Sequence, residues 1–130
     1  MTNQELINLA KTVRQKAYCP HSKFYVGAAI LDHRNKIFTS CNVENIAYPQ
    51  SSCAEAGAIS AMISDGGQLI KKIAIVGGNK KNTLNCSPCG GCRQRISEFS
   101  DENTEIIIKT NPIKWEIFKI DELLPHFFKF

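Results

Sequence analysis

No stretch of this sequence is apolar over the roughly 18 consecutive positions that a membrane-spanning helix requires. The N-terminal segment is polar and lacks the apolar core of a secretory signal peptide. Internal repeats, linkers and low-complexity stretches are also absent. With 43% apolar and 22% charged residues, the composition is typical of a soluble globular protein. We therefore expect a single cytoplasmic domain over residues 1–130.

Lysine and arginine form no stripe interleaved with aromatic residues, which is the pattern typical of nucleic-acid grooves. The net charge of +4 is carried by scattered side chains such as Lys71 and Lys80, and a solvated surface accounts for it. We expect neither a nucleic-acid nor a membrane partner. The sequence does contain six cysteines. In the absence of an export signal, these favour metal binding or catalysis over disulfides.

Apolar periodicity and turn residues predict a run of alternating helices and strands. The first helix begins at Thr2, where Glu5 completes a capping box, and it ends near Pro20, which cannot extend a helix. Helices between strands indicate an α/β fold, in which a mixed sheet is covered by helices on its faces. After the first helix we expect strands over residues 26–31 and 36–40, a helix over 53–64, a strand over 72–77, a helix over 90–99, strands over 105–110 and 115–120, and a short helix over 121–124.

Four residues at the starts of two predicted helices form the strongest chemical pattern. Cys53 and Glu55 open one helix, and Cys89 and Cys92 open the other as Pro-Cys-x-x-Cys. Backbone N–H groups and the positive end of a helix favour thiolates. Three thiolates fill three corners of a zinc tetrahedron and leave the fourth for water, which is the arrangement of catalytic zinc. Glu55 can then act as a base beside that water.

Two other interpretations fit parts of this pattern. A lone Cys-x-x-Cys in a cytosolic chain can be a redox dithiol, and Cys86 could complete a closed, structural four-cysteine zinc site. The combination of motifs favours catalysis. Cys-x-Glu, followed by Pro-Cys-x-x-Cys with its first cysteine 36 residues after Cys53, matches the three-cysteine form of the zinc-deaminase signature.

Over nearly its whole length the sequence resembles the small tri-cysteine cytidine deaminases. The segments that carry the resemblance are residues 22–29 (SKFYVGAA), 41–45 (CNVEN), 47–48 (AY), 53–55 (CAE), 88–94 (PCGGCRQ) and 122–125 (ELLP). The resemblance implies a three-layer α-β-α fold with a mixed five-stranded sheet, one Zn²⁺ per subunit and a homotetramer with shared active sites. It further implies hydrolysis of cytidine and deoxycytidine to uridine and deoxyuridine plus ammonia, a reaction of pyrimidine salvage.

The same resemblance implies roles for individual residues. Cys53, Cys89 and Cys92 are expected to hold the zinc. Glu55 is expected to move protons between the water, N3 of the cytosine ring and the departing amino group. Further residues are expected to contact the substrate: Phe24 on the pyrimidine face, Asn42 and Glu44 on the ribose hydroxyls, the backbone of Ala54 on the base, and Tyr48 and Phe128 in a neighbouring subunit's site.

One position departs from the family pattern. Many tri-cysteine members have Arg directly after Cys-Ala-Glu, where it can hydrogen-bond the ligand thiolates, whereas Ala56 and Gly57 follow here. Three thiolates on one Zn²⁺ leave a net negative charge, which weakens the pull of the metal on its water. We expect the two helix N-termini to offset this charge, aided by a direct contact from Arg93 or Arg95.

Two alternative functions are compatible with the metal motif. One is a deaminase of the same fold for another substrate, such as a blasticidin-type antibiotic or a nucleic acid. Glu44 and Asn45, at the expected ribose contact, argue against the antibiotic, and the lack of a strand-binding surface argues against the nucleic acid. The other is a non-catalytic zinc-binding module, which Glu55 beside an open zinc corner disfavours.

Overall fold

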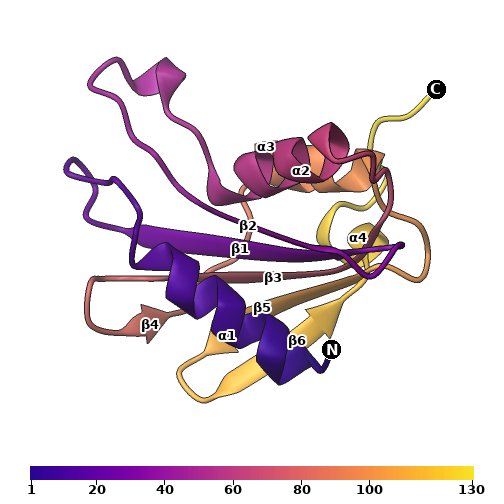
Figure 1. Cartoon of the computed structure of the whole chain (residues 1–130), viewed down its shortest axis with the longest axis horizontal. Coiled ribbons are helices and arrows are strands. Elements are labelled where there is room, and N and C mark those ends of the chain that lie inside the picture. Colours follow the sequence, from indigo (N-terminus) through magenta and orange to yellow (C-terminus); the bar gives the residue numbers. More distant parts are fainter.

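The computed structural model describes residues 1–130, whose course is shown in Figure 1. Its helices are α1 (Asn3–Arg14), α2 (Ala54–Ser64), α3 (Gly90–Glu98) and the short α4 (Ile120–Leu123), with a 3-10 turn η1 (Tyr48–Gln50). Its strands are β1 (Tyr25–Asp32), β2 (Ile37–Cys41), β3 (Ile70–Gly78), β4 (Thr83–Leu84), β5 (Glu105–Asn111) and β6 (Lys114–Phe118). None of the helices combines the length and the apolar character that crossing a membrane requires.

The strands form one mixed sheet in the order β2-β1-β3-β5-β6, and the two-residue β4 pairs with the end of β3. β3 and β5 are parallel, whereas the other pairs are antiparallel. A parallel pair needs a crossover connection, and α3 supplies it between β3 and β5. The predicted mixed five-stranded sheet is confirmed. β4 and η1 are additions that the apolar pattern did not predict, because both are too short to show a period.

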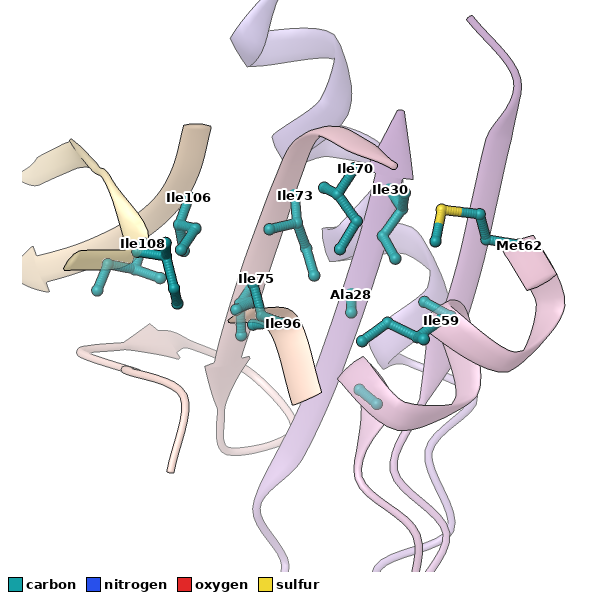
Figure 2. Close-up of a cluster of buried hydrophobic side chains, with 13 residues drawn as sticks. Ala28, Ile30, Ile59, Met62, Ile70, Ile73, Ile75, Ile96, Ile106 and Ile108 are labelled. Carbon is teal, nitrogen blue, oxygen red and sulfur yellow. The ribbon is translucent and has the colours of Figure 1, made fainter. Parts of the chain in front are cut away.

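Helices cover both faces of this sheet, so the fold has three layers, as predicted (Figure 1). Successive residues along β1, β3 and β5 point to opposite faces, and each face has its own apolar core. On the face covered by α2 and α3, isoleucines dominate the core, and Figure 2 shows them between the sheet and the two helices. The smaller core on the other face is closed by α1 and consists of Leu6, Ile7, Ala10, Ala29, Leu31, Ala74, Val76 and Ile107.

α1 lies directly on β1. A Cβ on Gly27 would fall 2.1 Å from the carbonyl oxygen of Ala10, so only glycine permits this approach. The predicted capping box is present, since Glu5 N donates to Thr2 Oγ1 at 3.1 Å and Thr2 N donates to Glu5 Oε2 at 2.8 Å. The helix ends at Arg14, several residues before Pro20. There the buried Arg14 guanidinium donates to the carbonyl of Asn79 at 2.9 Å, which ties the end of α1 to the chain after β3.

The turn between β1 and β2 is organised by Asp32, which is fully buried. Its carboxylate accepts hydrogen bonds from the backbone N–H groups of Arg34 and Lys36 and from Arg34 Nε, at 2.9 to 3.0 Å. Arg34 also contacts Asp65 at the end of α2. Although burial of the carboxyl opposes it, these hydrogen bonds hold the pKa of Asp32 below its usual value. The β1–β2 turn is thereby joined to the layer that carries the site.

Candidate metal and substrate site

Two helix N-termini meet on one face of the sheet, and each presents a cysteine. Cys53 is the N-cap of α2 and Cys89 is the N-cap of α3, while Cys92 lies in the first turn of α3. The three sulfur atoms lie within 4.8 Å of one another. Two separately predicted motifs are therefore brought together as one cluster.

The three sulfurs fit a soft divalent cation such as zinc. With Zn–S bonds of about 2.3 Å, ligand sulfurs in a tetrahedron are about 3.8 Å apart, so a small inward movement of these side chains closes the site. Cys86 is not part of the cluster, which removes the fourth ligand of the closed-site interpretation. Burial raises the pKa of the Cys86 thiol to about 12, as expected of a neutral buried thiol.

The helix ends act on the thiols of this cluster. Backbone N–H groups of Cys92 and Gly91 reach the sulfur of Cys89 and lower its pKa, whereas burial raises the pKa of Cys92, which is 1% exposed. A cysteine occupies the N-cap position of each helix, and no other side chain caps the helix there. The first-turn N–H groups of α2 and α3 are therefore the nearest positive dipoles to the cluster.

Glu55 lies beside the sulfur cluster, in the first turn of α2, and is only 5% exposed. Burial raises the pKa of its carboxyl, because desolvation disfavours the charged form. A carboxyl group with a raised pKa binds a proton more readily than an ordinary carboxylate, which suits a group that accepts and releases protons. The position of Glu55 on the same helical turn that presents Cys53 places this carboxyl group next to the three cysteine sulfurs.

A cavity of about 530 Å³ opens above Glu55 and the cysteines, and it is large enough for a nucleoside. Strand β1, the chain after β2 and the starts of α2 and α3 supply its walls. No lysine or arginine lines it. The lining contains nearly all of the predicted site residues: Phe24, Asn42, Glu44, Tyr48, Cys53, Ala54, Glu55, Cys89 and Cys92.

Asn42 is held by the backbone at the start of β1. Its Oδ1 accepts from Val26 N and its Nδ2 donates to the carbonyl of Phe24, both at 2.9 Å. These bonds use half of the hydrogen-bonding capacity of the amide, so one N–H and one lone pair remain for a ligand. They also fix the course of the chain that carries Phe24.

Glu44 closes a loop that the sequence did not reveal. Its carboxylate accepts from the backbone N–H groups of His21 and Ser22, at 2.9 and 3.1 Å, and from the Ser22 hydroxyl. The hydroxyl contact from Ser22 is the main reason why the pKa of Glu44 lies below its usual value. Both His21 and Ser22 line the cavity. No spacing signal marks them, because their role depends on a turn that precedes β1.

The other predicted substrate residues occupy different places. Phe24 is partly buried in the cavity wall, where Gly77 of β3 makes room for it: a Cβ at position 77 would lie 2.9 Å from Phe24 Cε2. Ala54 is fully buried as the first residue of α2. Tyr48 lies at the edge of its own chain's cavity and is 70% exposed. Phe128 is 69% exposed and lines no part of that cavity.

The two candidate arginines behave differently. A thiolate contact is expected from Arg93 or Arg95, and Arg93 does not make it: it donates to the carbonyls of Pro88 and Leu123 and to Ser87 Oγ, at 2.6 to 2.8 Å. Its guanidinium instead ties the segment before α3 to the end of α4. Arg95 does reach the cluster, since its Nη1 lies 3.9 Å from Cys92 Sγ.

Comparison with known proteins gives a consistent result. Residues 1–108 match the family model described as the cytidine and deoxycytidylate deaminase zinc-binding region. The chain is 38% identical over 125 residues to the cytidine deaminase of Sporosarcina psychrophila, covering 96% of this chain and 90% of that protein. It is likewise 38% identical over 124 residues to the cytidine deaminase of Mycoplasma genitalium, covering 95% and 93%. The crystal structure of cytidine deaminase from Burkholderia pseudomallei superimposes with a TM-score of 0.88 at 35% identity, covering 98% of this chain and all of that one.

Proposed function

Because this chain belongs to the cytidine deaminase family, and is thus a hydrolytic deaminase, we propose that the cavity above Glu55 is where cytidine and deoxycytidine react. The observation that carries the proposal is the convergence of three cysteine sulfurs within 4.8 Å of one another beside a buried carboxyl group. The cavity of about 530 Å³ accommodates a free nucleoside.

Cys53, Cys89 and Cys92 would hold one zinc ion per subunit. Zinc bound by three protein ligands supplies a water of lowered pKa, which is the nucleophile that attack on C4 of cytosine requires. The protein's part is to leave the fourth corner open. Cys86 lies outside the sulfur cluster, and Glu55 faces the cluster as a base.

Glu55 carries the proton transfers. It accepts a proton from the attacking water and donates it to N3 of the ring as the oxygen adds to C4. It then takes the second proton of that oxygen and delivers it to the amino group, which leaves as ammonia. The products are uridine or deoxyuridine. The raised pKa of Glu55 suits this alternation, because both protonation states must be accessible within one cycle.

Binding of the nucleoside would use the other residues that line the cavity. Phe24 covers the face of the pyrimidine, and the backbone of Ala54, at the start of α2, contacts its polar edge. Asn42 and Glu44 bind the ribose hydroxyls with the hydrogen-bonding capacity that their contacts to the chain leave free. A deoxyribose loses one of these hydroxyl contacts and keeps the rest.

We also propose that the active enzyme is a homotetramer in the cytoplasm, with each subunit forming one domain over residues 1–130. All six cysteines are free thiols, which suits a reducing compartment. Phe128 and Tyr48 are largely exposed on segments that extend from the body of the fold, the C-terminal tail and the loop between β2 and α2 (Figure 1). Such side chains are available to complete a neighbouring subunit's cavity.

The test is a substrate panel with zinc quantitation. Ammonia release and loss of the cytosine absorbance band are measured with cytidine, deoxycytidine, cytosine and a blasticidin-type antibiotic. Cytidine and deoxycytidine should react, and the protein should hold one zinc per chain. Selective turnover of the antibiotic would favour the alternative substrate, and zinc binding without ammonia release would favour the non-catalytic module.

A matched pair of cysteine variants locates the metal. Cys89→Ala removes a sulfur of the cluster and should abolish zinc retention and turnover. Cys86→Ala removes a thiol that lines the same cavity but lies outside the cluster, and it should keep its zinc. Loss of zinc in the Cys86 variant would reinstate the closed four-cysteine site.

A further inference from the structure

The proposed metal site has a charge imbalance within a partly buried environment. Three thiolates around a divalent ion carry a net negative charge, and the Glu55 carboxylate adds another beside them. Cys92 and Glu55 are 1% and 5% exposed, so water screens the charges of these two groups poorly, whereas Cys89 is exposed. No lysine or arginine lines the cavity, so no cation balances the cluster from the substrate side.

Arg95 is the cation that reaches the cluster from the opposite side. It lies one helical turn after Cys92 on α3, and its Nη1 is 3.9 Å from Cys92 Sγ, within range of a hydrogen bond to sulfur. The other arginine of this helix, Arg93, is engaged with Pro88, Leu123 and Ser87.

The local packing leaves space for this approach. Arg95 and Ala56 line the same hollow between α2 and α3, which shares no residue with the substrate cavity. A Cβ on Gly91 would lie 3.3 Å from Arg95 Nη1, so the glycine leaves the guanidinium room above the first turn of α3. The small side chain of Ala56 leaves the α2 side of the hollow open.

We propose that Arg95 is a positioning residue for the metal centre: by donating to Cys92 Sγ, its guanidinium holds this sulfur in place and offsets the charge of the three-sulfur set. The inference rests on the proposed zinc site. Arg95 on α3 would thereby balance charge at the cluster, which Ala56 on α2 cannot do because its side chain carries no charge. Polar groups that contact a metal ligand commonly change metal affinity by about 10- to 100-fold when they are removed.

The test is competition for zinc between the holoenzyme and a chromophoric chelator at fixed pH. Arg95→Gln should lower the apparent zinc affinity by about tenfold, because Arg95 is exposed at the surface and its effect falls at the low end of that range. Arg95→Lys keeps the charge but loses the planar fork, and should fall between Arg95→Gln and the parent. Lys71→Gln, which removes one positive charge from β3, should leave the zinc affinity unchanged.

Rescue separates charge balance from a structural role. Ala56→Arg in the Arg95→Gln background supplies a guanidinium to the same hollow, and should restore most of the lost affinity. An unchanged affinity in Arg95→Gln overturns the inference, as does a loss that neither Arg95→Lys nor the added arginine relieves. Absence of zinc from the parent protein, or its retention in Cys89→Ala, instead refutes the proposed metal site.

Discussion

Gly57 in α2 faces Ser40 in β2 so closely that a Cβ on the glycine would fall 2.1 Å from Ser40 Oγ and 3.0 Å from Ser40 Cβ. This contact sets the height of α2 above the sheet. Cys53 and Glu55 lie within the preceding helical turn, so the same contact sets their position.

Gly57→Ala should therefore impair both stability and turnover. Alanine favours a helix over glycine by about 1 kcal/mol, but forced overpacking costs about 1–3 kcal/mol, so the net effect is destabilising. Denaturant unfolding and steady-state kinetics measure the two effects. Adding Ser40→Gly removes both opposing atoms and should recover most of the loss. A single variant as stable and active as the parent would contradict the packing argument.

Glu55→Gln should keep the zinc and lose nearly all turnover, since an amide cannot move protons between water, ring and amino group. Zinc content and ammonia release, measured on the same preparation, distinguish loss of the metal from loss of the base. Substantial residual deamination in a zinc-loaded Glu55→Gln preparation would rule out this residue as the proton carrier.

Glu44→Gln should raise KM for cytidine by on the order of tenfold, with a smaller change for free cytosine, which has no ribose. Ser22→Ala serves as its partner variant, because it leaves the carboxylate in place but removes the hydroxyl that lowers the pKa of Glu44. Because the pKa of Glu44 lies below the usual value of about 4.3, the proposed ribose binding should be intact above that pH and weaken only as the pH falls through the lowered pKa. In Ser22→Ala, KM should begin to rise at a higher pH than in the parent. Equal effects on cytidine and cytosine would contradict a ribose role.

Asp32→Asn should destabilise the fold by about 1.5–3 kcal/mol, because a buried carboxylate with several hydrogen bonds loses its charge. The folded pKa of Asp32 lies below the unfolded value of about 3.9, so its contribution is full above that pH and declines as the pH falls toward the folded value. The stability difference between variant and parent, measured by unfolding curves from pH 7 downward, should therefore be constant above about pH 3.9 and narrow progressively below it. Parallel curves across that range would mean that the charge of Asp32 is not what stabilises the turn.

The sequence predicted most of the fold and the centre of the site, for physical reasons that can be named. Isoleucine-rich runs such as residues 72–77 mark strands buried on both faces, and Pro88 and Gly66 mark where helices begin and end. The cysteine motifs predicted the sulfur cluster because a helix N-cap and its first turn fix the relative direction of the side chains.

The remaining details depend on contacts between segments distant in the chain. Ser22 donates to Glu44, Arg93 donates to Leu123, and Arg95 reaches Cys92. These contacts depend on how loops and helices pack against one another. The end of α1 at Arg14 depends on acceptors in the segment after β3. Local periodicity in the sequence does not encode these contacts. The sequence therefore could not distinguish Arg93 from Arg95 as the arginine that contacts a cysteine.

The two separate cores on opposite faces of the sheet have a consequence for partial unfolding. α1 closes the smaller core, whereas α2 and α3, which carry the cysteines and Glu55, close the isoleucine-rich one. Detachment of α1 exposes Leu31, Val76 and Ile107 but removes no wall of the cavity. In hydrogen-exchange terms, the first helix can form a cooperative unit of its own, and its opening need not disturb the proposed active site on the other face of the sheet.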